Sequence, residues 1–222
     1  MWVLALDTTT AAGSAALADG ARVLEVAPLD ASQPVASRVP GDLMTLLARH
    51  GVELPRIDLF AVATGPGSFT GLRIGIAAMQ GLAFAGERPL VGVSAFEALV
   101  GLAEAPRVAP WIDAWRGEVY ATEYEHGVEL WAPIVATPEE ALASMRHADA
   151  VFIGDAAVKY RDRLPRVIAP TPLLAGAVAS LAHARAQAGE RPPPHAVRPM
   201  YVRRPDAELA REKAAAPGRP RR

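Results

Sequence analysis

A glycine-rich turn between an apolar strand and a helix constrains the fold of this chain more than any other segment. The turn, residues 65–71, reads GPGSFTG. It follows the apolar run 58–64, which predicts a buried strand, and it precedes a helix predicted over about residues 71–85. Glycine permits tight backbone turns, and the free N–H groups at a helix start attract anions. The segment therefore predicts a strand–turn–helix unit of an α/β fold with a candidate anion site at the turn.

The turn does not have the standard spacing of a phosphate-binding loop. Three residues separate Gly67 from Gly71, unlike the dinucleotide-binding fingerprint, and no Gly-Lys-Ser/Thr triplet follows. A tight turn in which Ser68 or Thr70 caps the helix accounts for the same residues without a ligand. The two interpretations, an anion site and a helix cap, both stay open at this point.

A second candidate turn follows the first predicted strand, at Asp7-Thr8-Thr9. In a nucleotide cleft, such a turn offers a carboxylate to a magnesium-bound water and hydroxyls to phosphate. An Asx or ST turn that closes a hairpin is the alternative, and spacing alone favours it. The candidate nucleotide- or anion-binding residues are Asp7, Thr8, Thr9, Gly65, Gly67, Ser68 and Thr70.

The order of predicted elements indicates the fold class. Three strands at 3–6, 14–18 and 22–26 predict an antiparallel meander, because Gly13 and Asp19-Gly20 lie where turns are needed. The remaining elements are a helix that ends before Gly51, the strand and helix around the glycine-rich turn, a strand at 90–93 and a helix at 95–102. The order β-β-β-α-β-α-β-α is that of one RNase H-like lobe, the unit of actin-like proteins.

The second half of the chain repeats this order loosely. Its predicted strands are 108–112, 118–124, 128–131 and 150–153, and its predicted helices are 138–145 and 173–187. Asp113 ends a strand before Gly117, as Asp7 does before Gly13. We therefore predict two RNase H-like (actin-like ATPase) lobes, each a mixed sheet flanked by helices. The predicted boundaries are 1–104 for a first lobe that carries a partner interface, 105–204 for a smaller, degenerate lobe and 205–222 for a basic, flexible tail.

Composition excludes several classes of site. The chain has no cysteine and five widely spaced histidines, and it contains neither an H-E-x-x-H nor a G-x-S-x-G motif, so we expect no catalytic residue and no metal site. No apolar run approaches the roughly 20 residues that span a bilayer, which favours a cytoplasmic protein. The net charge of −1 combines +4 over residues 203–222 with −5 over the rest, so we expect no basic nucleic-acid-binding face on the body.

The helix after the glycine-rich turn is rich in small residues and apolar on more than one side. Such a helix is either deeply buried or covered on its outer side by a partner. Its glycines persist most plausibly where another backbone comes close, which is more commonly the chain's own sheet than a helix of another subunit.

The run 65–75, GPGSFTGLRIG, strongly resembles the signature of the TsaB (YeaZ) family. Weaker matches in the expected order are LALDT at 4–8, IDA at 112–114, GEVY at 117–120 and PMYVR at 199–203. The resemblance covers roughly residues 1–204. It departs from the family pattern at Trp115, where arginine is common, and at Asp155, where a second glycine is frequent.

The resemblance implies a function as well as a fold. TsaB proteins are actin-like in fold but catalytically degenerate, and they pair with the related, metal-holding subunit TsaD. With the ATPase TsaE they transfer threonylcarbamoyl to the adenosine beside the anticodon of tRNA. The resemblance thus implies a non-catalytic partner subunit that reaches tRNA only through the complex, with no cofactor of its own and with ATP or ADP only in the assembled complex. It also implies that the first-lobe helices form a helical-bundle interface, either with TsaD or with a second copy of the chain. The residues of this predicted partner interface are Leu43, Leu46, Leu47, Gly71, Leu72, Gly75, Ile76, Ala78 and Met79.

Two other functions fit the same sequence. One is a homodimeric actin-like scaffold without a tRNA role, which would use the same helix surface. The other is a weak ATPase, which would need phosphate-binding turns on both lobes. A metallopeptidase, the older label of this superfamily, is a poorer fit. It would need metal ligands or a nucleophile with a base, and this chain offers neither.

Overall fold

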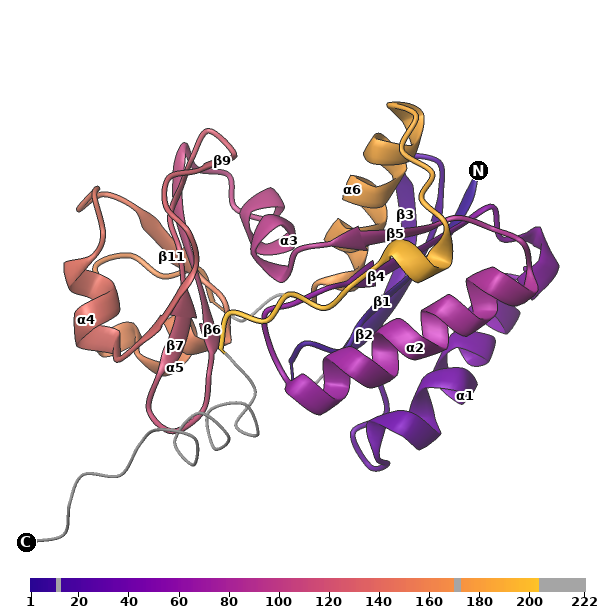
Figure 1. The fold of residues 1–222 in the computed structure, drawn as a ribbon, viewed down its shortest axis with the longest axis horizontal. Coiled ribbons are helices and arrows are strands. Elements are labelled where there is room, and N and C mark those ends of the chain that lie inside the picture. The colour runs from indigo at the N-terminus through magenta and orange to yellow at the C-terminus, as the bar shows by residue number, and fades with distance from the viewer. Residues whose placement is uncertain (11–12, 170–172, 204–222) are drawn as a thin grey trace, which may run out of the picture.

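The computed structural model describes residues 1–10, 13–169 and 173–203, which form two lobes side by side (Figure 1). The tail predicted at 205–222 lies outside these residues. Within the described ranges, no helix is long and apolar enough to cross a membrane.

The first lobe is built on a five-stranded sheet in the order β3-β2-β1-β4-β5. Its strands are β1 (Trp2–Asp7), β2 (Ser14–Asp19), β3 (Arg22–Pro28), β4 (Leu59–Ala63) and β5 (Leu90–Val93). The predicted meander is confirmed, because β1, β2 and β3 pair antiparallel, while β4 pairs parallel to both β1 and β5.

Both faces of this sheet are buried, which explains why its strands read as continuous apolar runs. Leu4 and Leu6 contribute to the core on one face, and Val3 and Ala5 contribute to the core on the other. Helices α1 (Val35–Arg49) and α2 (Phe69–Ala85) pack over the first of these faces, and α3 (Ala95–Gly101) and α6 (Ala175–Gln187) pack over the second.

The position of α6 corrects the predicted domain boundary. This helix falls in the range 105–204 that we assigned to the second lobe, yet it packs against β1, β2 and β3 of the first lobe. The physical reason is that the α3 side of the first sheet needs a second helix to cover it. Gly176 allows the close approach, because a Cβ there would lie 2.8 Å from Val26 Cγ2.

The second lobe has a six-stranded sheet in the order β10-β7-β6-β8-β9, with β11 parallel to β6. The strands are β6 (Arg107–Asp113), β7 (Val119–Ala121), β8 (Tyr124–Glu125), β9 (Val128–Glu129), β10 (Ile134–Ala136) and β11 (Val151–Ile153), and the helices are α4 (Pro138–Ala143) and α5 (Asp155–Lys159). The strand predicted at 118–124 is divided into β7 and β8, and the two residues between them, Thr122 and Glu123, are buried. The short elements β10 and α5 were not predicted.

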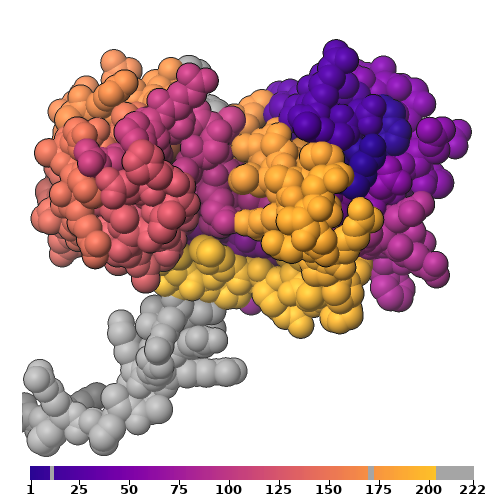
Figure 2. Space-filling model, turned by 90° about the horizontal axis from the view of Figure 1, so that it is seen from above, coloured from indigo at the N-terminus to yellow at the C-terminus, as the bar shows by residue number. Residues whose placement is uncertain are grey.

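Residues 191–203, which we call the closing segment, connect the two lobes (Figure 1). The Gln80 Nε2 on α2 donates to the carbonyls of Pro194 at 3.0 Å and Val197 at 3.1 Å. Further along, Met200 N donates to Thr64 O at 2.7 Å, and Arg203 forms an ion pair with Glu118 of the second lobe. The segment lies on the molecular surface, where Figure 2 shows it running from one lobe to the other.

Candidate functional site

The turn after β1 is a closed network of internal hydrogen bonds. Asp7 is 1% exposed, and its Oδ1 accepts from Thr9 N at 2.8 Å and from Thr9 Oγ1 at 2.6 Å. Thr8 Oγ1 donates to the Gly71 carbonyl at 2.8 Å. The Asx-turn interpretation of this segment is therefore confirmed, and its hydroxyls are already used within the chain.

The glycines of the 65–75 run allow the start of α2 to lie directly against this turn. A Cβ at Gly67 would overlap the Thr9 carbonyl, one at Gly71 would overlap the Thr8 carbonyl, and one at Gly75 would overlap Thr8 Oγ1. Only glycine fits at a position where another part of the chain comes this close to the backbone. The spacing of the signature is thus explained by the packing of α2 on Thr8 and Thr9.

Ser68 is the N-cap of α2. Its Oγ accepts from Gly71 N at 3.2 Å, and its own N–H donates to Thr9 O at 2.8 Å. Capping of this kind satisfies a backbone donor that the helix leaves free. The helix-cap interpretation of Ser68 is confirmed, and Thr70 lies exposed on the first turn of the helix.

The structure brings the candidate anion-binding residues together as the sequence predicted, but it buries five of the seven. Asp7, Thr8, Thr9, Gly65 and Gly67 are all buried. The Asp7 carboxylate and the Thr8 and Thr9 hydroxyls all form hydrogen bonds within the chain itself.

The charge of a second-lobe carboxylate, Asp155, acts on Asp7. Burial raises the pKa of Asp7 to about 6, and the charge of Asp155 contributes to this rise. Asp155 is the first residue of α5, and its Oδ1 accepts from Asp113 N and Ala156 N, both at 2.8 Å. Burial raises the pKa of Asp155 as well. We did not single out Asp155 as a site residue, although its position after Gly154 at the end of a buried strand was the available signal.

The equivalent turn of the second lobe is held by a surface ion pair. Asp113 Oδ2 accepts from Lys159 Nζ at 2.9 Å, and Asp113 Oδ1 accepts from Trp115 N at 3.0 Å. Among the described residues, no three His, Cys, Asp or Glu side chains gather in a way that could hold a metal ion.

The predicted partner interface is wrong in its choice of helix face. Eight of its nine residues lie on the buried sides of α1 and α2, and only Ala78 is partly exposed. The buried eight are Leu43, Leu46, Leu47, Gly71, Leu72, Gly75, Ile76 and Met79. The core on the α1 and α2 side of the first sheet contains Leu43, Leu46, Leu47, Ile76 and Met79, because a helix that covers a sheet buries its apolar stripe against that sheet.

The outer face of α2 is different in character. It exposes the small residues Ala77, Gly81 and Ala85, and the ring of Phe84 is 78% exposed. No atom lies within 4 Å of a Cβ built on Gly81, so the fold itself does not require glycine there. On α1, Met44 is 42% exposed.

Three comparisons relate the chain to known proteins. Residues 23–149, more than half of the chain, match the family model described as TsaD, tRNA N6-adenosine threonylcarbamoyltransferase. The chain is 40% identical over 153 residues to the tRNA threonylcarbamoyladenosine biosynthesis protein TsaB of Escherichia coli, a match that covers 63% of this chain and 64% of that protein. It is 31% identical to the TsaB of Haemophilus influenzae, covering 71% of this chain and 73% of that protein.

Solved structures agree with these relatives. YeaZ from Pseudomonas aeruginosa superposes with a TM-score of 0.76 at 34% identity, covering 90% of this chain and 99% of that one. A Clostridium difficile activator of 2-hydroxyisocaproyl-CoA dehydratase, solved with ADPNP, superposes at 0.55 with 9% identity, a likeness that concerns the fold alone. The predicted α/β fold with two actin-like lobes is confirmed, and the chain belongs to the TsaB (YeaZ) family.

Proposed function

We propose that this chain is the non-catalytic partner subunit for the transfer of threonylcarbamoyl to the adenosine next to the anticodon of tRNA. In this proposal it acts with TsaD and TsaE in the cytoplasm. Family membership supports the pathway, because the E. coli and H. influenzae relatives are named for threonylcarbamoyladenosine biosynthesis in tRNA. The match to the TsaD family model supports a pairing between two related lobed proteins.

One observation carries the non-catalytic role. The most specific motif of the chain, the glycine run from Gly65 to Gly75, is filled by its own Thr8 and Thr9. In this proposal the motif positions α2 and does not receive a phosphate. A subunit whose signature fixes a helix in place is better suited to presenting that helix than to chemistry.

The outer face of α2 is the surface that we assign to TsaD. Small residues at Ala77, Gly81 and Ala85 permit the close approach of another helix. Glycine inside a helix costs about 1 kcal/mol relative to alanine. Because nothing within the chain lies near Gly81, a partner helix explains its presence better than internal packing.

Reconstitution tests the proposal. The chain is combined with its cognate TsaD and TsaE, threonylcarbamoyl-adenylate, ATP and unmodified tRNA, and modified adenosine is measured by mass spectrometry. We expect product only when the chain is present. Equal product without the chain would overturn the proposal and direct attention to the scaffold alternative, for which light scattering should reveal a stable homodimer.

Nucleotide binding is assigned to the assembled complex and not to the isolated chain. The closed turn at Asp7, Thr8 and Thr9 supports this assignment. Calorimetric titration of the isolated chain with ATP and magnesium should give no binding heat, whereas the complex should bind. Micromolar binding to the isolated chain would favour the weak-ATPase alternative.

A further inference from the structure

A groove with a positive charge excess runs along α2, where the closing segment meets the helix. It consists of two successive hollows, which we call the α2 groove. The first, of about 770 Å³, lies between the end of α2 and residues 191–195. The second, of about 260 Å³, lies between Arg73–Gln80 and residues 197–201. The bonds from Gln80 to Pro194 and Val197 mark the junction between them.

Four arginines line this groove, and none of them forms an ion pair with a carboxylate among the described residues. They are Arg73, Arg88, Arg191 and Arg198. Glu87 is the one carboxylate that lines either hollow in the part of the chain described here. Elsewhere most basic side chains are neutralised in pairs such as Arg49–Glu25, Arg107–Glu125, Lys159–Asp113, Arg163–Glu139 and Arg185–Glu97. The groove thus holds a local positive charge on a body whose net charge is negative.

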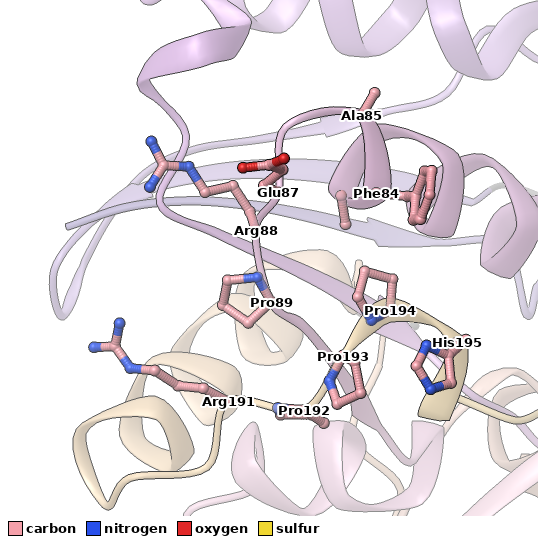
Figure 3. Close-up of a pocket in the computed structure, with 11 residues that line it drawn as sticks. Phe84, Ala85, Glu87, Arg88, Pro89, Arg191, Pro192, Pro193, Pro194 and His195 are labelled. Atoms are coloured by element: carbon pink, nitrogen blue, oxygen red, sulfur yellow. The ribbon is translucent and has the colours of Figure 1, made fainter.

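Exposed aromatic rings accompany these arginines. Figure 3 shows the guanidinium groups of Arg88 and Arg191 extending from one end of the first hollow, with Phe84 and His195 at the other end. Phe84 is 78% exposed and packs on nothing that would explain its size. In the second hollow, Tyr201 is 38% exposed, its hydroxyl accepts from Arg73 Nε at 2.9 Å, and its ring lies 5.3 Å from that of Phe69.

Arginine forks bind phosphates in a bidentate manner, and exposed aromatic faces stack on unpaired bases. An acidic peptide would also satisfy the arginines, but it would leave the exposed ring of Phe84 without a matching group. Charge and aromatic rings together therefore favour a nucleic-acid strand over an acidic protein.

We propose that the α2 groove binds a segment of the tRNA directly, with its arginines on phosphates and Phe84 against a base. This inference rests on the proposed function for the identity of the RNA. It replaces the expectation that the chain reaches tRNA only through the complex.

The test is the affinity for unmodified tRNA transcript, measured by fluorescence anisotropy at several KCl concentrations. It uses the full chain alone and the full chain assembled with TsaD. The groove variant is R88Q/R191Q. The matched control is R146Q/R166Q, which removes two exposed arginines of the second lobe that likewise have no ion pair among the described residues. Phe84→Ala tests stacking.

We expect R88Q/R191Q to weaken binding at least tenfold and to reduce the salt slope of log K by about 1.4 to 1.8, since each lost phosphate contact removes roughly 0.7 to 0.9. The control should stay within about twofold. Phe84→Ala should weaken binding about fivefold or more without changing the salt slope, because stacking releases no counterions.

Three results would overturn the inference. The first is equal loss in both double variants, which would show unspecific attraction, and the second is no tRNA binding by either the chain or its complex. The third is unchanged tRNA binding by R88Q/R191Q with weaker capture of TsaD or TsaE, which would assign the groove to an acidic protein surface. Because binding is read separately from modification, a groove variant that binds tRNA normally in an active complex overturns this inference and leaves the proposed function intact.

Discussion

The backbone of Gly75 lies directly against the Thr8 side chain, so that a Cβ at position 75 would overlap Thr8 Oγ1. The same hydroxyl donates to the Gly71 carbonyl one turn earlier in α2. Helix and turn are therefore fitted to one another without room for a methyl group.

Gly75→Ala should destabilise the protein by about 1–3 kcal/mol, because forcing a methyl group into a packed contact outweighs the better helix propensity of alanine. Urea unfolding followed by circular dichroism measures this change. Gly81→Ala is the matched control in the same helix: its Cβ meets open space, so stability should rise by up to about 1 kcal/mol. Equal effects of the two substitutions would contradict the packing role of Gly75.

Asp7 should make folding stability fall as the pH rises. Its folded pKa of about 6 lies above the ordinary aspartate value of 3.8, so the folded state holds the proton more tightly than the unfolded state. The stabilisation is fully present below pH 4 and is lost as the pH rises through 6, a change of about 3 kcal/mol.

Asp7→Asn removes this titration while keeping an oxygen acceptor for Thr9. The stability of the variant relative to the parent should therefore improve between pH 4 and pH 7 by about the same 3 kcal/mol. Denaturant unfolding at both pH values checks it. A difference in unfolding free energy between variant and parent that stays the same at both pH values would show that Asp7 ionises normally.

Glu123 is a buried carboxylate that anchors the segment after α4. It is fully buried, and it accepts from Arg146 N at 2.7 Å and His147 N at 3.1 Å, while His147 Nδ1 lies 2.8 Å from Oε1. Glu123→Gln places an amide N–H among these donors and should cost about 3 kcal/mol in unfolding free energy.

Glu125→Gln is the control for Glu123, because its carboxylate pairs with Arg107 at a partly exposed site. Loss of this ion pair should lower the free energy of unfolding by no more than about 1 kcal/mol. A loss of similar size in both variants would argue against an anchoring role for Glu123.

The outer face of α2 should be required for assembly. Ala77→Glu places a charge on that face and should reduce TsaD binding at least tenfold in a pull-down or calorimetric titration, because the charge would be desolvated at the interface. The fold should persist by circular dichroism. Ala143→Glu, an equivalent exposed change on α4, should bind TsaD normally. Normal binding by Ala77→Glu would move the interface elsewhere.

Local sequence rules account for much of the first lobe. The alternation of apolar strands with Gly13 and Asp19-Gly20 predicted the meander, and the position of Ser68 before an apolar helix offered the cap that the structure has. These features depend on neighbours in the chain, which periodicity and turn chemistry report directly.

Contacts between distant segments were not available from those rules. The assignment of α6 to the first sheet and the burial of Leu43, Leu46 and Leu47 depend on which face of the sheet lacks a cover. A stripe of leucines looks the same in sequence whether it packs on the chain's own sheet or on a partner. That ambiguity explains why the predicted interface fell on the inner face of α1 and α2.

The sequence by itself determined the strand–turn–helix units, the RNase H-like order of the first lobe and the family, because these follow from local patterns and from a motif with fixed spacing. Only the tertiary structure decided what the glycine run does. These glycines, Gly67, Gly71 and Gly75, could leave room for a phosphate or allow another part of the chain to pack closely. Which of the two occurs depends on the position of Thr8 and Thr9, more than 55 residues earlier in the chain. The tertiary structure likewise gathered Arg88 and Arg191 into one groove, since their proximity arises from the return of the closing segment to α2.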